Sequence, residues 1–224
     1  MAGQGVAARG RSGGCEITDR GSGVVAQWEL MADHIDLRAQ LAIGRSPLDV
    51  GRVPEISGWI CDHPRRIPRL IELLWDGDPG VASRAADVLE RIMRRPSGAL
   101  ARAVAAYKDA LIGLLSEAQP AKVRWNLALT IPRTELTVPD CRRVASVLQT
   151  WLDDRSSIVK TAALHGIAEL TRQNPASLPA ALDLLRAAGR SGTPAMRARS
   201  RVLLKKLEKP LAARPAHSGL HMFG

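Results

Sequence analysis

Aromatic side chains are scarce in this sequence of 224 residues, which has five Trp, one Tyr and one Phe. Aromatic and β-branched residues are enriched in β-strands, so their scarcity argues against a β-sandwich. The interior must instead be built from Ala, Leu, Val and Ile, which suit closely packed helices. Hydrophobic residues make up 46% of the sequence, which is too many for a chain that is disordered throughout.

Cysteines and long apolar segments are also few. The three cysteines, Cys15, Cys61 and Cys141, are scattered and form no C-x-x-C pair, which is typical of free thiols in a reducing compartment. No apolar run approaches the roughly 18 residues of a membrane-spanning helix. The N-terminus also lacks the apolar segment of a secretory signal. We therefore expect a cytoplasmic protein that has no membrane partner.

Motifs of catalysis and metal binding are absent as well. The sequence contains no G-x-x-x-x-G-K, G-x-S-x-G or H-E-x-x-H. The pairs Asp76/Asp78 and Asp153/Asp154 fit turns and helix caps better than catalysis. The three potential ligands in Cys61-Asp62-His63 are consecutive and have no second cluster to complete a metal shell. We expect no catalytic residue, no metal and no cofactor, and the sequence favours a role other than that of an enzyme.

One helical pattern, in contrast, occurs four times. An apolar lead residue is followed by small residues about four and five places later, and by Leu or Ile at about eight and eleven places. The lead residues, Val81, Val123, Val159 and Met196, are 42, 36 and 37 residues apart. A period of this length is typical of stacked helix pairs, in which each pair buries its apolar stripe against its neighbours.

This pattern divides the chain into three parts. Residues 1–25 are rich in Gly, Ser and Arg and are expected to be disordered, and Met31 is a hypothetical native start. Residues 26–209 are predicted to form one helical-repeat domain, in which 26–62 is a degenerate first helix pair that caps the array. Residues 210–224 are expected to form a flexible tail.

The clearest copy, Asp78-Pro79-Gly80-Val81 followed by Ala85-Ala86 and Leu89, resembles the HEAT-repeat family of armadillo-type α-solenoids. The resemblance is good over residues 65–208 and weak over 26–62. It implies an all-α fold, a right-handed α-α superhelix of about four helical hairpins. Proteins of this architecture present a concave face to their partners.

Trp125 is the most suggestive single residue. It lies two places after the lead Val123, where the other copies have Ser83, Thr161 and Ala198. Leu129 and Arg133 follow at four and eight places, so the three side chains can form one patch on the concave face. Interface hot spots favour Trp and Arg. The predicted partner-binding site comprises Trp125, Leu129, Arg133, Arg124, Arg84, Arg91 and Lys160. Alternatively, Trp125 packs between adjacent repeats.

The net charge of +10 is concentrated near the C-terminus. Residues 186–214 hold nine basic residues and one acid, Glu208. Arg197, Arg201, Lys205 and Lys209 recur every four residues and therefore share one face of a helix; we call these four the basic stripe. The stripe suits an anionic partner, either nucleic acid or an acidic protein segment. Alternatively, it is the polar outer surface that a terminal repeat requires.

These features favour a non-catalytic binding or scaffold module that recognises a protein or peptide through its concave face. The second hypothesis is a nucleic-acid-binding protein, because some HEAT-like proteins are DNA glycosylases for alkylated bases that combine a basic concave face with tryptophans. No acidic residue beside Trp125 matches their catalytic aspartate. The third hypothesis is an assembly or maturation factor, as in the HEAT-like lyases that attach pigments to proteins.

Overall fold

The structure is a computed structural model that describes residues 35–117 and 120–212, with side chains placed through Lys209. Every regular element in this part of the chain is a helix, which confirms the all-α prediction. The eleven α-helices are α2 (Leu37–Ala42), α3 (Val53–Asp62), α4 (Ile67–Glu72), α5 (Pro79–Ile92), α6 (Gly98–Ala105), α7 (Lys108–Leu115), α8 (Ala121–Thr130), α9 (Val138–Thr150), α10 (Ser157–Leu170), α11 (Leu178–Ser191) and α12 (Pro194–Ala212). The five short 3₁₀ helices are η1 (Pro64–Arg66), η2 (Leu73–Trp75), η3 (Ile131–Arg133), η4 (Trp151–Asp153) and η5 (Pro175–Ser177).

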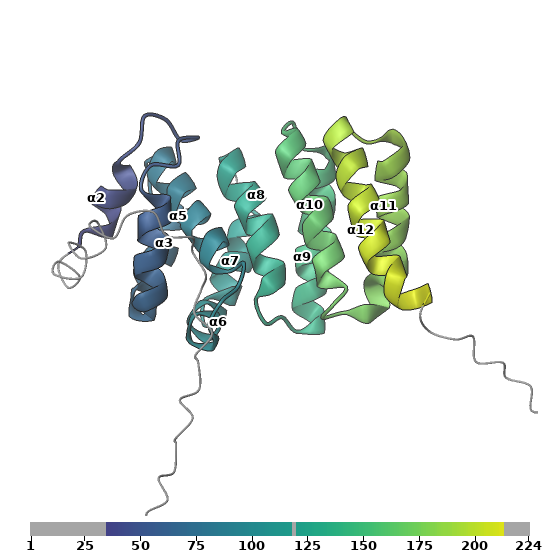
Figure 1. The fold of residues 1–224 in the computed structure, drawn as a ribbon, viewed down its shortest axis with the longest axis horizontal. Helices are drawn as coiled ribbons and strands as arrows, with labels where there is room; N and C mark the ends of the chain where they lie inside the picture. Colours follow the sequence, from purple (N-terminus) through teal and green to yellow (C-terminus); the bar gives the residue numbers. More distant parts are fainter. Residues whose placement is uncertain (1–34, 118–119, 213–224) are drawn as a thin grey trace, which may run out of the picture.

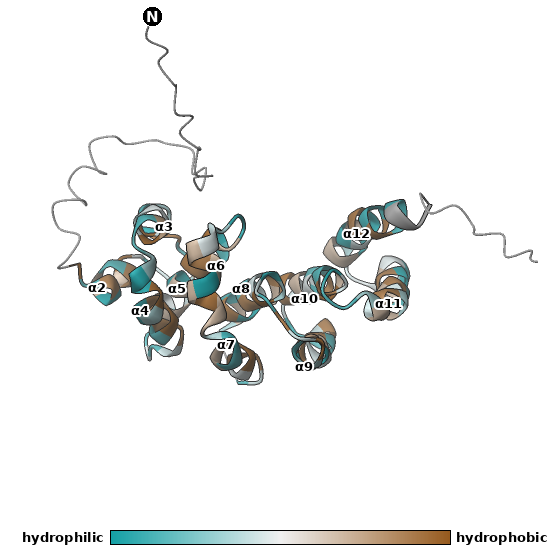
Figure 2. Cartoon of the chain, turned by 90° about the horizontal axis from the view of Figure 1, so that it is seen from below, coloured by the Kyte–Doolittle hydropathy of each residue, from teal (hydrophilic) through white to brown (hydrophobic). Residues whose placement is uncertain are grey.

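The helix pairs follow one another in chain order along the molecule (Figure 1). The two helices pack together in each of α4–α5, α7–α8, α9–α10 and α11–α12. The second helices also pack in sequence, α5 on α8, α8 on α10 and α10 on α12. Figure 2 shows α4, α7 and α9 along one side of the row formed by α5, α8 and α10, whereas α3, α6 and α12 stand on the other side and α11 lies at the end of the row. We call the side of α8 and α10 that faces away from α7 and α9 the inner side.

The local sequence explains where several helices begin and end. The Asp78 carboxylate accepts hydrogen bonds from the backbone nitrogens of Gly80 and Val81, at 2.7 and 3.3 Å, and Pro79 occupies the first position of α5, as the sequence predicts. Helix α8 ends at Thr130 because Pro132 cannot continue its hydrogen bonding.

Helix α9 begins with a capping box in which Thr137 and Asp140 bond each other's backbone nitrogens. The Nζ of Lys108 on the preceding helix α7 lies 2.7 Å from the Asp140 carboxylate. This ammonium and the hydrogen bonds from Thr137 lower the pKa of Asp140 to about 2. The cap therefore also ties α9 to α7.

The apolar interior consists of two parts. A large core runs without interruption from Leu37 in α2 to Ala181 in α11. A smaller cluster, which we call the terminal core, lies between α10, α11 and α12. It comprises Leu164, Ala168, Leu185, Ala188, Met196 and Leu203. The last helix pair is therefore held mainly by its own short set of apolar contacts.

Two segments differ from the sequence-based expectation. One first helix is expected to carry both Val104 and Leu111, but the chain breaks at Ala106–Tyr107 into α6 and α7. The break lets α6 pack on α4 and η1 while α7 packs on α8 and α9. Helix α12 extends to Ala212, beyond the predicted boundary at 209. Residues 1–25 and Met31 lie outside the described residues, as does most of the predicted tail.

Candidate functional site

The environment of α8 determines where Trp125 and Leu129 lie. Lys122 and Asn126 face α5, where they bind Asp87 at 2.6 and 2.7 Å. The Ala128 carbonyl lies against Gly166 of α10. At 100° per residue, Trp125 and Leu129 lie around the helix between the residues that face α5 and those that face α10. They are therefore left on the inner side, half-buried and resting on the large core. The Trp125 side chain thus has features of both interpretations, because it packs on the core and keeps a partly exposed surface.

The same offsets from the lead residue define the inner side in all four copies of the sequence pattern. The positions at two, six and ten places after each lead are half-exposed or exposed, apart from the buried Ser83. They are Ser83, Asp87 and Arg91; Trp125, Leu129 and Arg133; Thr161, His165 and Glu169; and Ala198, Val202 and Lys206. Among these four described sets, the one that begins with Trp125 is the only set that has both an aromatic ring and an apolar side chain. The sets beside it, on α5 and α10, carry charged, imidazole or hydroxyl groups.

A pocket of about 510 Å³ opens where this line ends, between the last turns of α5, α8 and α10 and the side of α12. We call it the η3 pocket. It is lined by Met93, Arg94, Pro132, Arg133, Thr134, Glu135, His165, Glu169, Arg172, Gln173 and Lys206. The Gln173 amide donates to the carbonyls of Pro132 and Thr134 at 2.9 and 3.0 Å, and its oxygen accepts from Leu136 N at 2.9 Å. These bonds fix the irregular wall that follows α8.

The buried carboxylate of Glu90 organises one side of the η3 pocket. It binds Arg94 and Arg133, each through a guanidinium nitrogen 2.8 Å from a carboxylate oxygen. Burial raises the pKa of Glu90, but these hydrogen bonds outweigh it, so the pKa lies below its usual value. Glu90 is therefore ionised at neutral pH and holds two cations at the rim.

On the other side of the η3 pocket, Glu169 holds the surrounding cations in the same way. Its carboxylate lies 2.5 Å from the Nζ of Lys206 and 3.2 Å from an Nη of Arg172. The His165 imidazole, with Nε2 at 3.6 Å, also faces it. Interaction with His165, and then with Lys206 and Arg172, lowers the pKa of Glu169 despite its burial. The η3 pocket thus has two ionised carboxylates that anchor a ring of cations.

Arg84 does not contribute to this surface. Its side chain is only 2% exposed, and its guanidinium donates to the backbone carbonyls of Leu41, Ala42 and Ser46. It is therefore not available to a partner. Arg91, one turn from Asp87 on α5, lies half-buried on the inner side.

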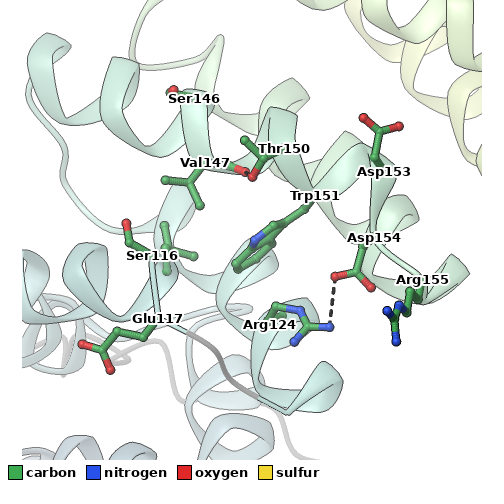
Figure 3. A pocket seen from close by; sticks show the side chains of 11 residues that line it. Ser116, Glu117, Arg124, Ser146, Val147, Thr150, Trp151, Asp153, Asp154 and Arg155 are labelled. Carbon is green, nitrogen blue, oxygen red and sulfur yellow. Dashed lines mark hydrogen bonds and ion pairs between the residues drawn. The ribbon is translucent and has the colours of Figure 1, made fainter.

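Arg124 and Lys160 lie apart from Trp125 as well. Arg124 is paired with Asp154 at 3.0 Å and lines a second pocket of about 730 Å³ between the ends of α7 and α9, the first turn of α8 and the loop before α10. Figure 3 shows this ion pair beside the Trp151 ring. Lys160 is five residues from His165, which turns its side chain by about 140° around the helix, away from the inner side. Of the predicted set of seven, Trp125, Leu129, Arg133 and Arg91 therefore share the inner side, whereas Arg84, Arg124 and Lys160 lie elsewhere.

The basic stripe lies at the far end of the molecule on α12. Arg197, Arg201, Lys205 and Lys209 are all exposed. Arg197 donates to the carbonyl of Gly192 at 2.8 Å, and none of the four forms an ion pair with a described residue. The neighbouring Lys206 instead belongs to the η3 pocket.

Five residues of the η3 pocket were not predicted from the sequence: Arg94, His165, Glu169, Arg172 and Lys206. A signal for three of them was present: applying the offsets of Trp125, Leu129 and Arg133 to the later copies selects His165, Glu169 and Lys206. Nothing in the sequence, however, indicates that Glu90 and Glu169 are buried beneath cations from neighbouring helix pairs.

No group of three or more His, Cys, Asp or Glu side chains within residues 35–117 and 120–209 is placed to hold a metal ion. None of the described helices is long and apolar enough to cross a membrane. Comparison of the chain with protein-family models, with curated proteins and with solved structures finds no match.

Proposed function

We propose that this protein is a HEAT-like α-solenoid that binds a protein or peptide segment along the inner side of α8 and α10. In this proposal α4–α5, α7–α8, α9–α10 and α11–α12 are the four hairpins of a right-handed superhelix, α2 and α3 form its N-terminal cap, and the inner side is its concave face. The protein acts as a scaffold and not as a catalyst.

One observation carries the proposal: Trp125 and Leu129 are partly exposed one turn apart on α8, and Arg133, four residues further on, lines the η3 pocket. Trp and Arg dominate the binding energy of many interfaces, especially where they border a pocket. The flanking helices α3, α6 and α12 stand on the same side (Figure 2). A partner segment that lies on α8 and α10 therefore meets walls at both ends.

The electrostatics of the η3 pocket favour binding over catalysis. A general base works best when its pKa is near the operating pH. The pKa values of Glu90 and Glu169 are instead lowered, and ion pairs occupy both carboxylates. Such carboxylates are weak bases and serve to hold the surrounding cations.

Selection of displayed random linear peptides on the immobilised full-length chain tests this function. We expect enriched peptides whose dissociation constant rises at least tenfold, about 1.4 kcal/mol, with Trp125→Ala or Leu129→Ala. Trp75→Ala is the matched control because Trp75 is an exposed Trp outside the inner side. Circular dichroism checks that each variant is folded. A failure to enrich any peptide, or equal effects of Trp125→Ala and Trp75→Ala, contradicts the proposal.

The basic stripe supports a second candidate function, the binding of nucleic acid. Like charges four residues apart destabilise a helix by roughly 0.2–0.5 kcal/mol per pair, and the four exposed cations lack acidic partners among the described residues. Phosphates would supply the missing negative charge. Affinity for a labelled DNA duplex should then fall steeply between about 50 and 200 mM salt.

Arg201→Gln/Lys205→Gln should weaken that binding and lower its salt dependence, while Arg142→Gln/Arg143→Gln on α9 should not. An absence of duplex binding at the lowest salt concentration rules out this candidate.

A further inference from the structure

We infer that the partner segment of the proposed function is acidic, and that the η3 pocket receives one of its Asp or Glu side chains while Trp125 and Leu129 contact an apolar neighbour. The inference rests on the proposed function and adds the chemistry of the partner. It depends on how the charges of the η3 pocket are arranged.

Three of the four cations of the η3 pocket face outward, whereas the two carboxylates that anchor them face inward; Arg133 is mostly buried and the third acid, Glu135, is exposed. The side chains of Arg94, Arg172 and Lys206 are 63%, 73% and 56% exposed, whereas those of Glu90 and Glu169 are 5% and 11% exposed. An approaching ligand therefore meets these three exposed cations before it meets Glu90 or Glu169. The carboxylates beneath hold these flexible side chains in place, which lowers the entropy that binding has to remove.

The anchoring bonds leave most hydrogen-bond donors unused. Arg94 binds Glu90 through Nε and one Nη, and Arg172 binds Glu169 through one Nη. A guanidinium has five N–H donors in a planar fork that matches a carboxylate. Each arginine can thus bind the buried glutamate and a second carboxylate at the same time.

The charge balance selects a carboxylate over a polyanion. Four cations (Arg94, Arg133, Arg172 and Lys206) surround the pocket, and three acids (Glu90, Glu135 and Glu169) lie within or beneath it. The small positive excess suits one or two carboxylates. A nucleic-acid backbone would need a larger excess, which the η3 pocket lacks and the basic stripe has.

The size and position of the pocket suit a side chain of a longer segment. A volume of about 510 Å³ lies within the usual range for small-ligand sites, so one acidic side chain and its flanking backbone fit. Arg133 both ends the line from Trp125 and lines the pocket. The best ligand should therefore carry an apolar residue beside its acidic residue.

Two parallel peptide selections with amidated C-termini test this inference, because amidation leaves only side-chain carboxylates. The full-length chain should enrich peptides rich in Asp and Glu beside apolar residues. The variant Arg94→Glu/Arg172→Glu should lose that preference and enrich Lys and Arg instead. Arg142→Glu/Arg143→Glu is the matched control, since both arginines are exposed on α9, and it should keep the acidic preference.

The affinity of the best peptide should fall at least tenfold when its acidic residue is changed to the neutral amide. The imidazole NMR signals of His165, assigned with a His165→Asn variant, should shift during titration with the acidic peptide. These signals place the ligand in the η3 pocket even where a charge-reversed variant folds poorly.

The possible failures are distinguishable. If peptides are enriched and depend on Trp125 but show no acidic preference, or if the preference survives Arg94→Glu/Arg172→Glu, the acidic partner is wrong and the proposed function stands. If the acidic peptides shift no His165 signal, they bind elsewhere and the inference fails. If no peptide is enriched at all, both fail.

Discussion

Arg84 shows how single residues tie the helix pairs together. Its guanidinium donates to the carbonyls of Leu41 and Ala42 in the last turn of α2, and to Ser46 in the loop that follows. The last carbonyls of a helix have no partner within the helix, and a cation there also opposes the negative end of the helix dipole. A buried side chain of α5 thus completes the end of a helix that lies about 40 residues earlier.

We predict that Arg84→Met lowers the free energy of unfolding by about 3 kcal/mol, because three carbonyls lose a charged donor. Arg91→Met, a change of the same kind on the same helix, should cost well under half of that, since Arg91 is half-buried and no carbonyl is known to depend on it. Urea denaturation followed by circular dichroism measures both. Equal losses would show that the bonds of Arg84 add nothing to stability.

At the scale of the helices, the contact between α8 and α10 depends on a residue that has no side chain. A Cβ added to Gly166 would collide with the carbonyl oxygen of Ala128 and lie 2.7 Å from a methyl group of Leu148. The Ala128 carbonyl is backbone and cannot move without shifting α8, and the Leu148 methyl belongs to a fully buried side chain that has little room to move. Small residues near the middle of the helices therefore set how closely neighbouring pairs approach.

Gly166→Ala should accordingly destabilise the protein by roughly 1–3 kcal/mol through overpacking. The same substitution at Gly113 in α7, where nothing lies within 4 Å of the added Cβ, should stabilise it by about 0.4–1 kcal/mol, because Ala reduces the freedom of the unfolded chain. Thermal unfolding of the two variants gives the comparison. The two substitutions should change the stability in opposite directions. A stabilised Gly166→Ala variant would mean that α8 and α10 separate easily.

At the scale of the whole molecule, the two apolar clusters imply uneven stability. The large core joins residues from α2 to α11, while the terminal core holds α11 and α12 to α10 with six buried residues. Regions with few buried contacts open at lower free energy than the rest of a protein. The C-terminal pair, which carries the basic stripe and Lys206, should therefore be the first to open.

Leu203→Ala tests this arrangement, because it removes a buried side chain of the terminal core and should cost about 2–5 kcal/mol locally. Hydrogen exchange measured by mass spectrometry should become much faster in residues 178–209 and stay nearly unchanged in α5. Leu204→Ala, at a half-buried neighbouring position, serves as the control. Uniform acceleration along the chain would show that the protein unfolds as one unit.

The sequence alone was sufficient for the features that depend on local order. The spacing of apolar residues predicted helices and, through the four copies, their pairing along the chain. Asp78, Pro79 and Pro132 marked helix ends because capping and proline geometry act within a few residues. Helical periodicity also placed Trp125 and Leu129 on one face, but it left open whether Trp125 is exposed or packed between repeats.

Only the tertiary structure decided which charged side chains are buried, paired or free. Arg84 bonds to Leu41 across 43 residues, Arg133 to Glu90 across 43 and Lys206 to Glu169 across 37. These separations are close to the spacing of the lead residues, so the partners lie on neighbouring helix pairs. An arginine at the surface of one pair can be buried by the next, because burial depends on the neighbour's position and not on local sequence.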